Sequence, residues 1–144
     1  MKNRIGITLA VIGLIFFFYA PGWGAEWLLI GVTKVGIYSY DVTRITHPSK
    51  GIVQVWEKII WTDEGRKVLV EKDVQKLKIL NHTKVLYEFD CRDQKYHILS
   101  SIDYSKNDDV LNVRKIERDP WMSIFPDSIL EDFYKAVCTE QEEP

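Results

Sequence analysis

The sequence predicts an α+β domain in which a sheet of short strands carries one C-terminal helix, tied to the sheet by a disulfide. Three observations predict this class. Short runs rich in β-branched and aromatic residues follow one another between turn residues. A segment with helical spacing of its apolar residues comes after the last run. Two cysteines, Cys91 and Cys138, lie in a strand-like run and at the end of that helix.

An apolar leader precedes the domain. Residues Ile5 to Ala25 contain no charged side chain, and Lys2 and Arg4 stand just before them. A positive start, an apolar centre and small residues at the end are typical of a secretory signal peptide. We therefore expect residues 1–24 to be removed and residues 25–144 to form the exported domain. The alternative is an uncleaved anchor, because about 20 apolar residues can span a bilayer.

Charge and length limit the classes of function. The chain has 19 Lys and Arg against 21 Asp and Glu, and loss of the leader removes two positive charges. Nucleic-acid binding rewards clustered basic charge, so we expect no nucleic-acid partner. We expect membrane contact only if the leader stays uncleaved. The mature chain has the length of one domain with its own core.

The mature chain opens with three strand-like runs. Trp27 to Thr33 and Ile37 to Asp41 are apolar or aromatic runs with a short connection between them. Gly51 to Trp61 is rich in β-branched and aromatic residues, which favours a long strand. The turn residues before that strand end at Pro48. Because proline rarely continues a strand, we expect none there.

The next segment has a mixed pattern. Asp63 to Gly65 ends the long strand, and the apolar residues of Arg66 to Leu80 are spaced loosely as in a helix. We expect a short helix to open the segment from Arg66 to Leu80.

Three more strands are expected. Thr83 to Cys91 alternates, which places Val85, Tyr87, Phe89 and Cys91 on one face. Tyr96 to Tyr104 is its expected partner, and Val110 to Ile116 the last strand. Alternation in the partner strand gives one face with Tyr96, Ile98, Ser100, Ile102 and Tyr104 and another with His97, Leu99, Ser101 and Asp103.

A capping box marks the C-terminal helix. Ser128 and Glu131 have the S-x-x-E spacing. Glu131 and Lys135 form an i, i+4 pair on the outer face. We expect the tail from Thr139 to fray. The apolar positions follow the i, i+3, i+4, i+7 rule at Leu130, Phe133, Tyr134 and Val137.

The two cysteines are expected to pair. Cys91 lies on the apolar face of its strand, and Cys138 lies one turn after Tyr134 on the apolar side of the helix. Outside the cytosol, thiols that meet at one interface form a disulfide. The alternatives are two buried free thiols or a redox pair. A redox pair lacks the C-x-x-C spacing, and two Cys without a His cluster make a poor zinc site.

The ordered segments resemble the surface-adhesin protein E family of bacterial envelopes. They are WLLIG (Trp27 to Gly31), YSYD (Tyr38 to Asp41), VQVW (Val53 to Trp56), LYEFDC (Leu86 to Cys91), KYHILSSIDYS (Lys95 to Ser105) and WMSIFPDSILEDFYKAVC (Trp121 to Cys138). The resemblance implies a curved, antiparallel, six-stranded sheet with its helix tied by Cys91 and Cys138, and a homodimer. Unlike some relatives that are lipoproteins, this leader has no cysteine to acylate. Glu64 to Lys84 looks like an insertion.

The polar residues form no catalytic or metal-binding motif. We expect Asp41 to cap the turn that follows it, and Asp90 and Asp103 to lie on a solvated strand face. The remaining candidates lack ligand spacing or a nucleophile elbow; they are His47, His82, His97, Ser100 and Ser101. We therefore expect no enzyme, no cofactor and no metal.

The candidate binding residues are Trp56, Trp61, Trp121 and His97. The tryptophans either fill the sheet–helix core or line an exposed aromatic patch. We expect a non-enzymatic, exported binding domain that acts through a sheet face or edge on a protein or another envelope or extracellular component. Its location would be the periplasm, the cell surface or the medium.

Two other functions stay open. One is a carrier of a small flat ligand such as haem, with a pocket between helix and sheet that His97 reaches. The other is a structural envelope component held by an uncleaved leader.

Overall fold

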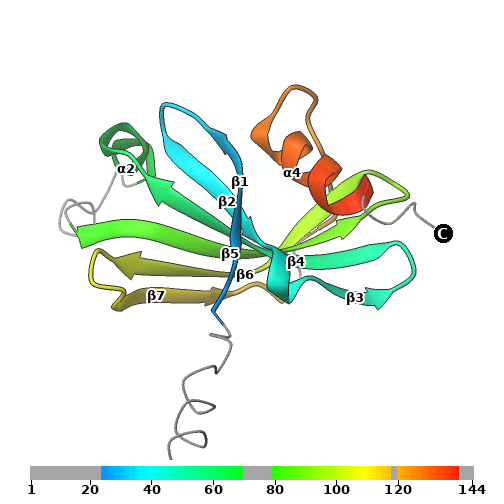
Figure 1. Ribbon diagram of the computed structural model, residues 1–144, viewed down its shortest axis with the longest axis horizontal. Coiled ribbons are helices and arrows are strands. Elements are labelled where there is room, and N and C mark those ends of the chain that lie inside the picture. Colours follow the sequence, from blue (N-terminus) through cyan, green and yellow to red (C-terminus); the bar gives the residue numbers. More distant parts are fainter. Residues whose placement is uncertain (1–23, 70–78, 118–119, 140–144) are drawn as a thin grey trace, which may run out of the picture.

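Six antiparallel strands lie side by side in the order β1-β2-β4-β5-β6-β7, and together they form one curved sheet (Figure 1). The computed structural model describes residues 24–69, 79–117 and 120–139. The strands are β1 (Trp27–Val32), β2 (Gly36–Asp41), β3 (Thr46–Ser49), β4 (Ile52–Trp61), β5 (Leu80–Asp90), β6 (Lys95–Ser105), β7 (Val110–Lys115) and β8 (Met122–Ser123). The helices are η1 (Val42–Arg44), α2 (Asp63–Leu69) and α4 (Ile129–Cys138). The predicted α+β class, with a curved antiparallel sheet and a C-terminal helix, is confirmed.

The sheet has two chemically different faces. In β4, Val53, Val55, Glu57 and Ile59 are buried, whereas the residues between them are partly or fully exposed. Because side chains alternate along a strand, the buried set shares one face. Helix α4 packs on that face, which we call the helix face. The opposite side is called the open face.

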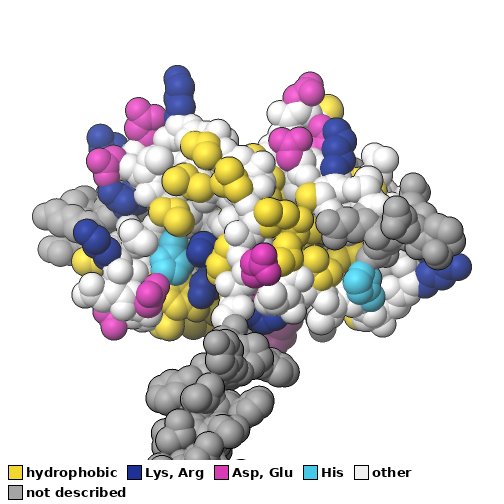
Figure 2. Space-filling view, in the orientation of Figure 1, with side chains coloured by type: hydrophobic (Ala, Val, Ile, Leu, Met, Phe, Trp, Pro, Cys, Tyr) yellow, Lys and Arg dark blue, Asp and Glu magenta, His cyan; other side chains and the backbone are white. Residues whose placement is uncertain are grey.

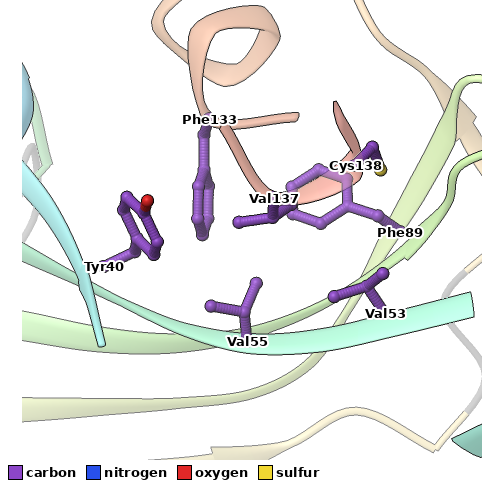
Figure 3. Packing of buried hydrophobic residues seen from close by; sticks show 7 residues of the cluster. All are labelled: Tyr40, Val53, Val55, Phe89, Phe133, Val137 and Cys138. Carbon is purple, nitrogen blue, oxygen red and sulfur yellow. The ribbon is translucent and has the colours of Figure 1, made fainter. Parts of the chain in front are cut away.

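Phe133 is the centre of the core under α4 (Figure 3). Its ring is fully buried and contacts Phe89 edge-on, with 5.1 Å between ring centroids. Tyr40 lies on its other side, at 5.6 Å. Burial of such a side chain stabilises the folded protein by roughly 1.5–3 kcal/mol. Phe133 is therefore the main apolar anchor of the helix.

The end of α4 is fixed to the turn after β5. Cys91 and Cys138 form a disulfide with their Cα atoms 5.5 Å apart, as predicted. One turn earlier on the helix, the Tyr134 hydroxyl donates a hydrogen bond of 2.8 Å to the Cys91 carbonyl. The helix therefore has a covalent and a polar tie to the same backbone position.

The start of α4 has the predicted cap. The Ser128 Oγ accepts a hydrogen bond from the Glu131 N–H at 3.1 Å. The Glu131 carboxylate accepts from the Asp127 N–H at 2.9 Å and pairs with Lys135 at 3.0 Å. The tail beyond Thr139 lies outside the described residues.

Helix α2 begins three residues earlier than expected, at Asp63 instead of Arg66. Thr62 explains the start, because its Oγ1 accepts from the Gly65 N–H at 3.1 Å. The helix lies against the β1–β2 turn, where a Cβ on Gly65 would come within 1.9 Å of the Val35 carbonyl oxygen. Only glycine permits that approach. Residues 70–78 lie outside the described part of the chain.

Two short strands were not predicted. Pro48 lies in β3, which is exposed and, among the described strands, pairs with β4 alone. A proline is tolerated there because an edge strand need not donate every ladder hydrogen bond. Strand β8 follows β7 in the chain and pairs with the start of β6, so Val110 to Ile116 does not contain the last strand.

A bulge in β6 overturns the predicted faces of that strand. Leu86 pairs with Ser100 while Tyr87 pairs with Ile98, so one extra residue lies between them. A bulge moves the following side chains to the other face. Asp103 is consequently buried on the helix face and accepts a hydrogen bond from Thr83 at 2.9 Å. The expectation that Asp103 is solvated was wrong.

Candidate binding face

Three of the four predicted binding residues lie on or beside the open face. Trp56 alternates with the buried Val55 in β4, so it lies opposite α4. His97 pairs in register with Glu88, which pairs with Gln54 of β4. Trp121 is 41% exposed and stacks on the His97 ring, with centroids 4.1 Å apart.

A row of polar contacts crosses the open face toward Trp121. The Gln54 amide donates to one oxygen of Glu88. The other oxygen lies 3.0 Å from Nε2 of His97. Both ends of the His97–Glu88 pair are mostly buried, so the row holds the ring against which Trp121 stacks. The arrangement presents the Trp121 ring at the surface, stacked on His97.

Trp61 lies on the helix face instead. It packs against the buried cluster of Tyr38, Ile59 and Val85. Its Nε1 donates to the Thr83 hydroxyl at 2.8 Å. Trp61 therefore fills the core margin, which was one of the two interpretations of the tryptophans.

Exposed apolar side chains lie on the open face in β1, β2, β4 and β7. Val32, Ile37 and Ile60 are mutual neighbours in register, as are Leu29, Ser39 and Lys58. The exposed large apolar residues on this face are Leu29, Val32, Ile37, Ile60, Val110 and Val113. Figure 2 shows hydrophobic side chains beside basic and histidine side chains over β2, β4 and β5. The sequence signal that could have found them is the alternation within each short strand.

Asp41 and His82 have local structural partners. Burial raises the pKa of Asp41, but hydrogen bonds from Thr43 and Arg44 outweigh it, and the net shift is downward. Asp41 thus caps η1 as expected. Burial lowers the pKa of His82, whose Nδ1 accepts from the Asn81 amide at 3.2 Å. Within the described ranges, no group of three or more His, Cys, Asp or Glu could hold a metal ion.

A shallow cleft of about 200 Å³ lies beside α4. It is lined by Gln94, Ile124, Pro126, Glu131, Tyr134 and Lys135. Small-molecule pockets usually measure roughly 300–1,000 Å³. His97 points to the other side of the sheet, so this cleft does not provide the pocket that a haem carrier with a His97 ligand requires.

Glu57 is a buried carboxyl group that the sequence pattern did not reveal. It lies on the helix face, 3% exposed, and is hydrogen-bonded to the hydroxyl of Tyr87. Burial raises the pKa of Glu57 from 4.5 to about 8. The same burial and the nearby Glu57 raise the pKa of Tyr87. At neutral pH the folded protein therefore keeps Glu57 protonated.

The fold and sequence both match known proteins. The model of the family described as surface-adhesin protein E matches residues 27–139. Crystal form II of Haemophilus influenzae protein E matches with a TM-score of 0.53 and 15% identity, covering 83% of this chain and all (100%) of that chain. Another structure of Haemophilus influenzae protein E has a TM-score of 0.49 and 12% identity, covering 77% and 89% of the two chains. The first of these shows a shared fold. No curated protein matches the chain.

Replacing Glu57 should change how stability depends on pH. A folded-state pKa above the unfolded value makes the folded protein lose stability as pH rises from 4.5 toward 8. Glu57→Gln keeps the shape and cannot ionise, so it should remove this loss, which is on the order of a few kcal/mol by pH 9. Urea unfolding at pH 5 and pH 9 measures this change in the free energy of unfolding. Glu64→Gln, an exposed control on α2, should keep the wild-type slope. An unchanged slope in Glu57→Gln would contradict the assignment.

Proposed function

Because the chain belongs to the surface-adhesin protein E family, we propose that it is an exported, non-enzymatic binding domain that holds its partner on the open face. The observation that carries this proposal is the difference between the two faces. The helix face is closed by α4, which buries Phe133 and is tied down at Cys138. The open face exposes apolar and aromatic side chains on a rigid sheet.

The composition of the open face supports a macromolecular partner. Single exposed apolar residues occur on ordinary protein surfaces, whereas contiguous ones mark interaction sites. Aromatic residues are enriched at the centres of protein interfaces. Trp121 and Trp56 supply such rings, and the contact of His97 with Glu88 fixes the first of them.

We also propose that residues 1–24 are a signal peptide and that the mature protein acts in the periplasm, on the cell surface or outside the cell. Strand β1 begins at Trp27, and Glu26 accepts a hydrogen bond from Val42 at 3.0 Å. Cleavage after Gly24 would leave this first contact intact. Within the described residues, no helix is long and apolar enough to cross a membrane.

Site-specific photo-crosslinking tests the open face. A photoreactive phenylalanine at Val113 or at Trp121 should give adducts with a partner in the native cell envelope. The same group at Lys135, on the outer side of α4, should give none. Excess unlabelled protein should suppress the adducts, and so should an excess of the Lys135→Glu variant. An excess of the Ile60→Glu, Val113→Glu double variant should not suppress them. Adducts confined to the Lys135 position would refute the proposed face.

N-terminal sequencing of the protein from its native compartment tests the leader. The expected first residue is Ala25, because cleavage after Gly24 places the small Gly22 at the −3 position. Recovery of the intact leader in the membrane fraction would favour an anchored component instead.

A further inference from the structure

Two lysines face each other at the middle of the open face. Lys58 of β4 and Lys84 of β5 are paired in register, so their side chains project to the same side. Like charges directly opposite each other in a sheet are destabilising. Burial lowers the pKa of Lys58, and the charge of Lys84 lowers it further. Holding both charges here costs the fold stability.

The described acidic side chains compensate this pair only from a distance, through Asp108 and Asp41. In the described segments, neither ammonium group has a carboxylate within the 4.0 Å of an ion pair. Their close partners are aromatic rings: Lys58 Nζ lies 4.5 Å from the centre of the Trp27 ring, and Lys84 Nζ lies 4.7 Å from that of Tyr104. The rings hold the two cations without neutralising them.

These two acids also have contacts of their own. Both oxygens of Asp41 accept hydrogen bonds, from Thr43 and from Arg44. An oxygen of Asp108 lies 3.7 Å from Nε2 of His82. The pair is therefore a positive centre in a mainly apolar surface. In register, Leu29 follows beyond Ser39 on one side, and Val113 follows beyond Ile102 on the other.

We propose that Lys58 and Lys84 together bind a carboxylate of an acidic side chain on a protein partner, whose apolar neighbours cover the surrounding open face. This inference rests on the proposed function and adds the chemistry of the partner. Charge complementarity requires an anion at the centre, and the exposed valine, leucine and isoleucine side chains require apolar groups around it.

A second copy of this chain fits the site poorly. A two-fold dimer through the centre of the open face places the same patch on both sides of the interface. Each lysine pair would then meet another lysine pair. The repulsion of four positive charges therefore favours a different, acidic protein over a face-to-face homodimer.

The first test needs no partner. Lys58→Met keeps the aliphatic stem and removes the charge, so the free protein should unfold at a higher urea concentration. Lys50→Met, an exposed lysine in the turn before β4, should leave the midpoint unchanged. A midpoint that falls or stays the same in Lys58→Met would overturn the claim that the charge of Lys58 destabilises the free protein.

The second test measures binding by NMR titration of the mature protein with the peptide acetyl-Val-Glu-Val-Glu-Val-amide. Shifts should centre on the amides around Lys58 and Lys84. Affinity should fall at least tenfold for the Gln-for-Glu peptide and for the Lys58→Met, Lys84→Met variant, but not for Lys50→Met. Equal binding of the two peptides, or lysine-dependent binding of anionic phosphatidylglycerol vesicles without peptide binding, would overturn the inference. So would a dimer, detected by sedimentation, that the open-face variant Ile60→Glu, Val113→Glu abolishes. Open-face crosslinks that persist in the double variant would leave the proposed function standing and reject this inference alone.

Discussion

The docking of one short helix on one face of the sheet is the constraint on which the rest of the structure depends. Phe133 fills the space between Tyr40 and Phe89, and the Cys91–Cys138 disulfide fixes the end of the helix to the turn after β5. A long closed loop of this kind restricts the unfolded chain, which stabilises the folded one. Because the helix covers only one side, the other side of the sheet remains a continuous surface.

Neighbouring residues in β4 show how differently the two faces treat charge. Glu57 points to the helix face, where burial raises its pKa to about 8 and keeps it neutral, hydrogen-bonded to Tyr87. Lys58 points to the open face and keeps its charge beside Lys84, against an aromatic ring. Both positions reduce stability relative to an apolar residue. On the helix face the cost is limited by protonation, whereas on the open face it is recovered when an anion binds.

Several features of the fold could be predicted from patterns within single segments of the sequence. The Ser128 cap and the alternation of β5 follow from short-range chemistry, and the pairing of the two cysteines follows from the faces on which they lie; all three are confirmed. The faces of β6 could not be predicted past Leu99, because a bulge adds one residue and reverses the alternation, which buries Asp103. The burial of Glu57 and the Lys58–Lys84 pair depend on strand register. Register is a relation between strands, so the sequence of a single strand does not predict it. Trp56, His97 and Trp121 were named from residue type, and only the register brings them to one side of the sheet.

Hydroxyl-radical footprinting of the mature protein, free and bound to the partner identified by crosslinking, tests most directly the claim that the helix closes one face and the other face binds. The account predicts that binding lowers the oxidation of Ile60 and Trp121 on the open face severalfold. It predicts no change at Phe125, which is exposed in the loop before α4. Protection confined to Phe125 and the outer side of α4, with Ile60 and Trp121 as reactive as in the free protein, would contradict it.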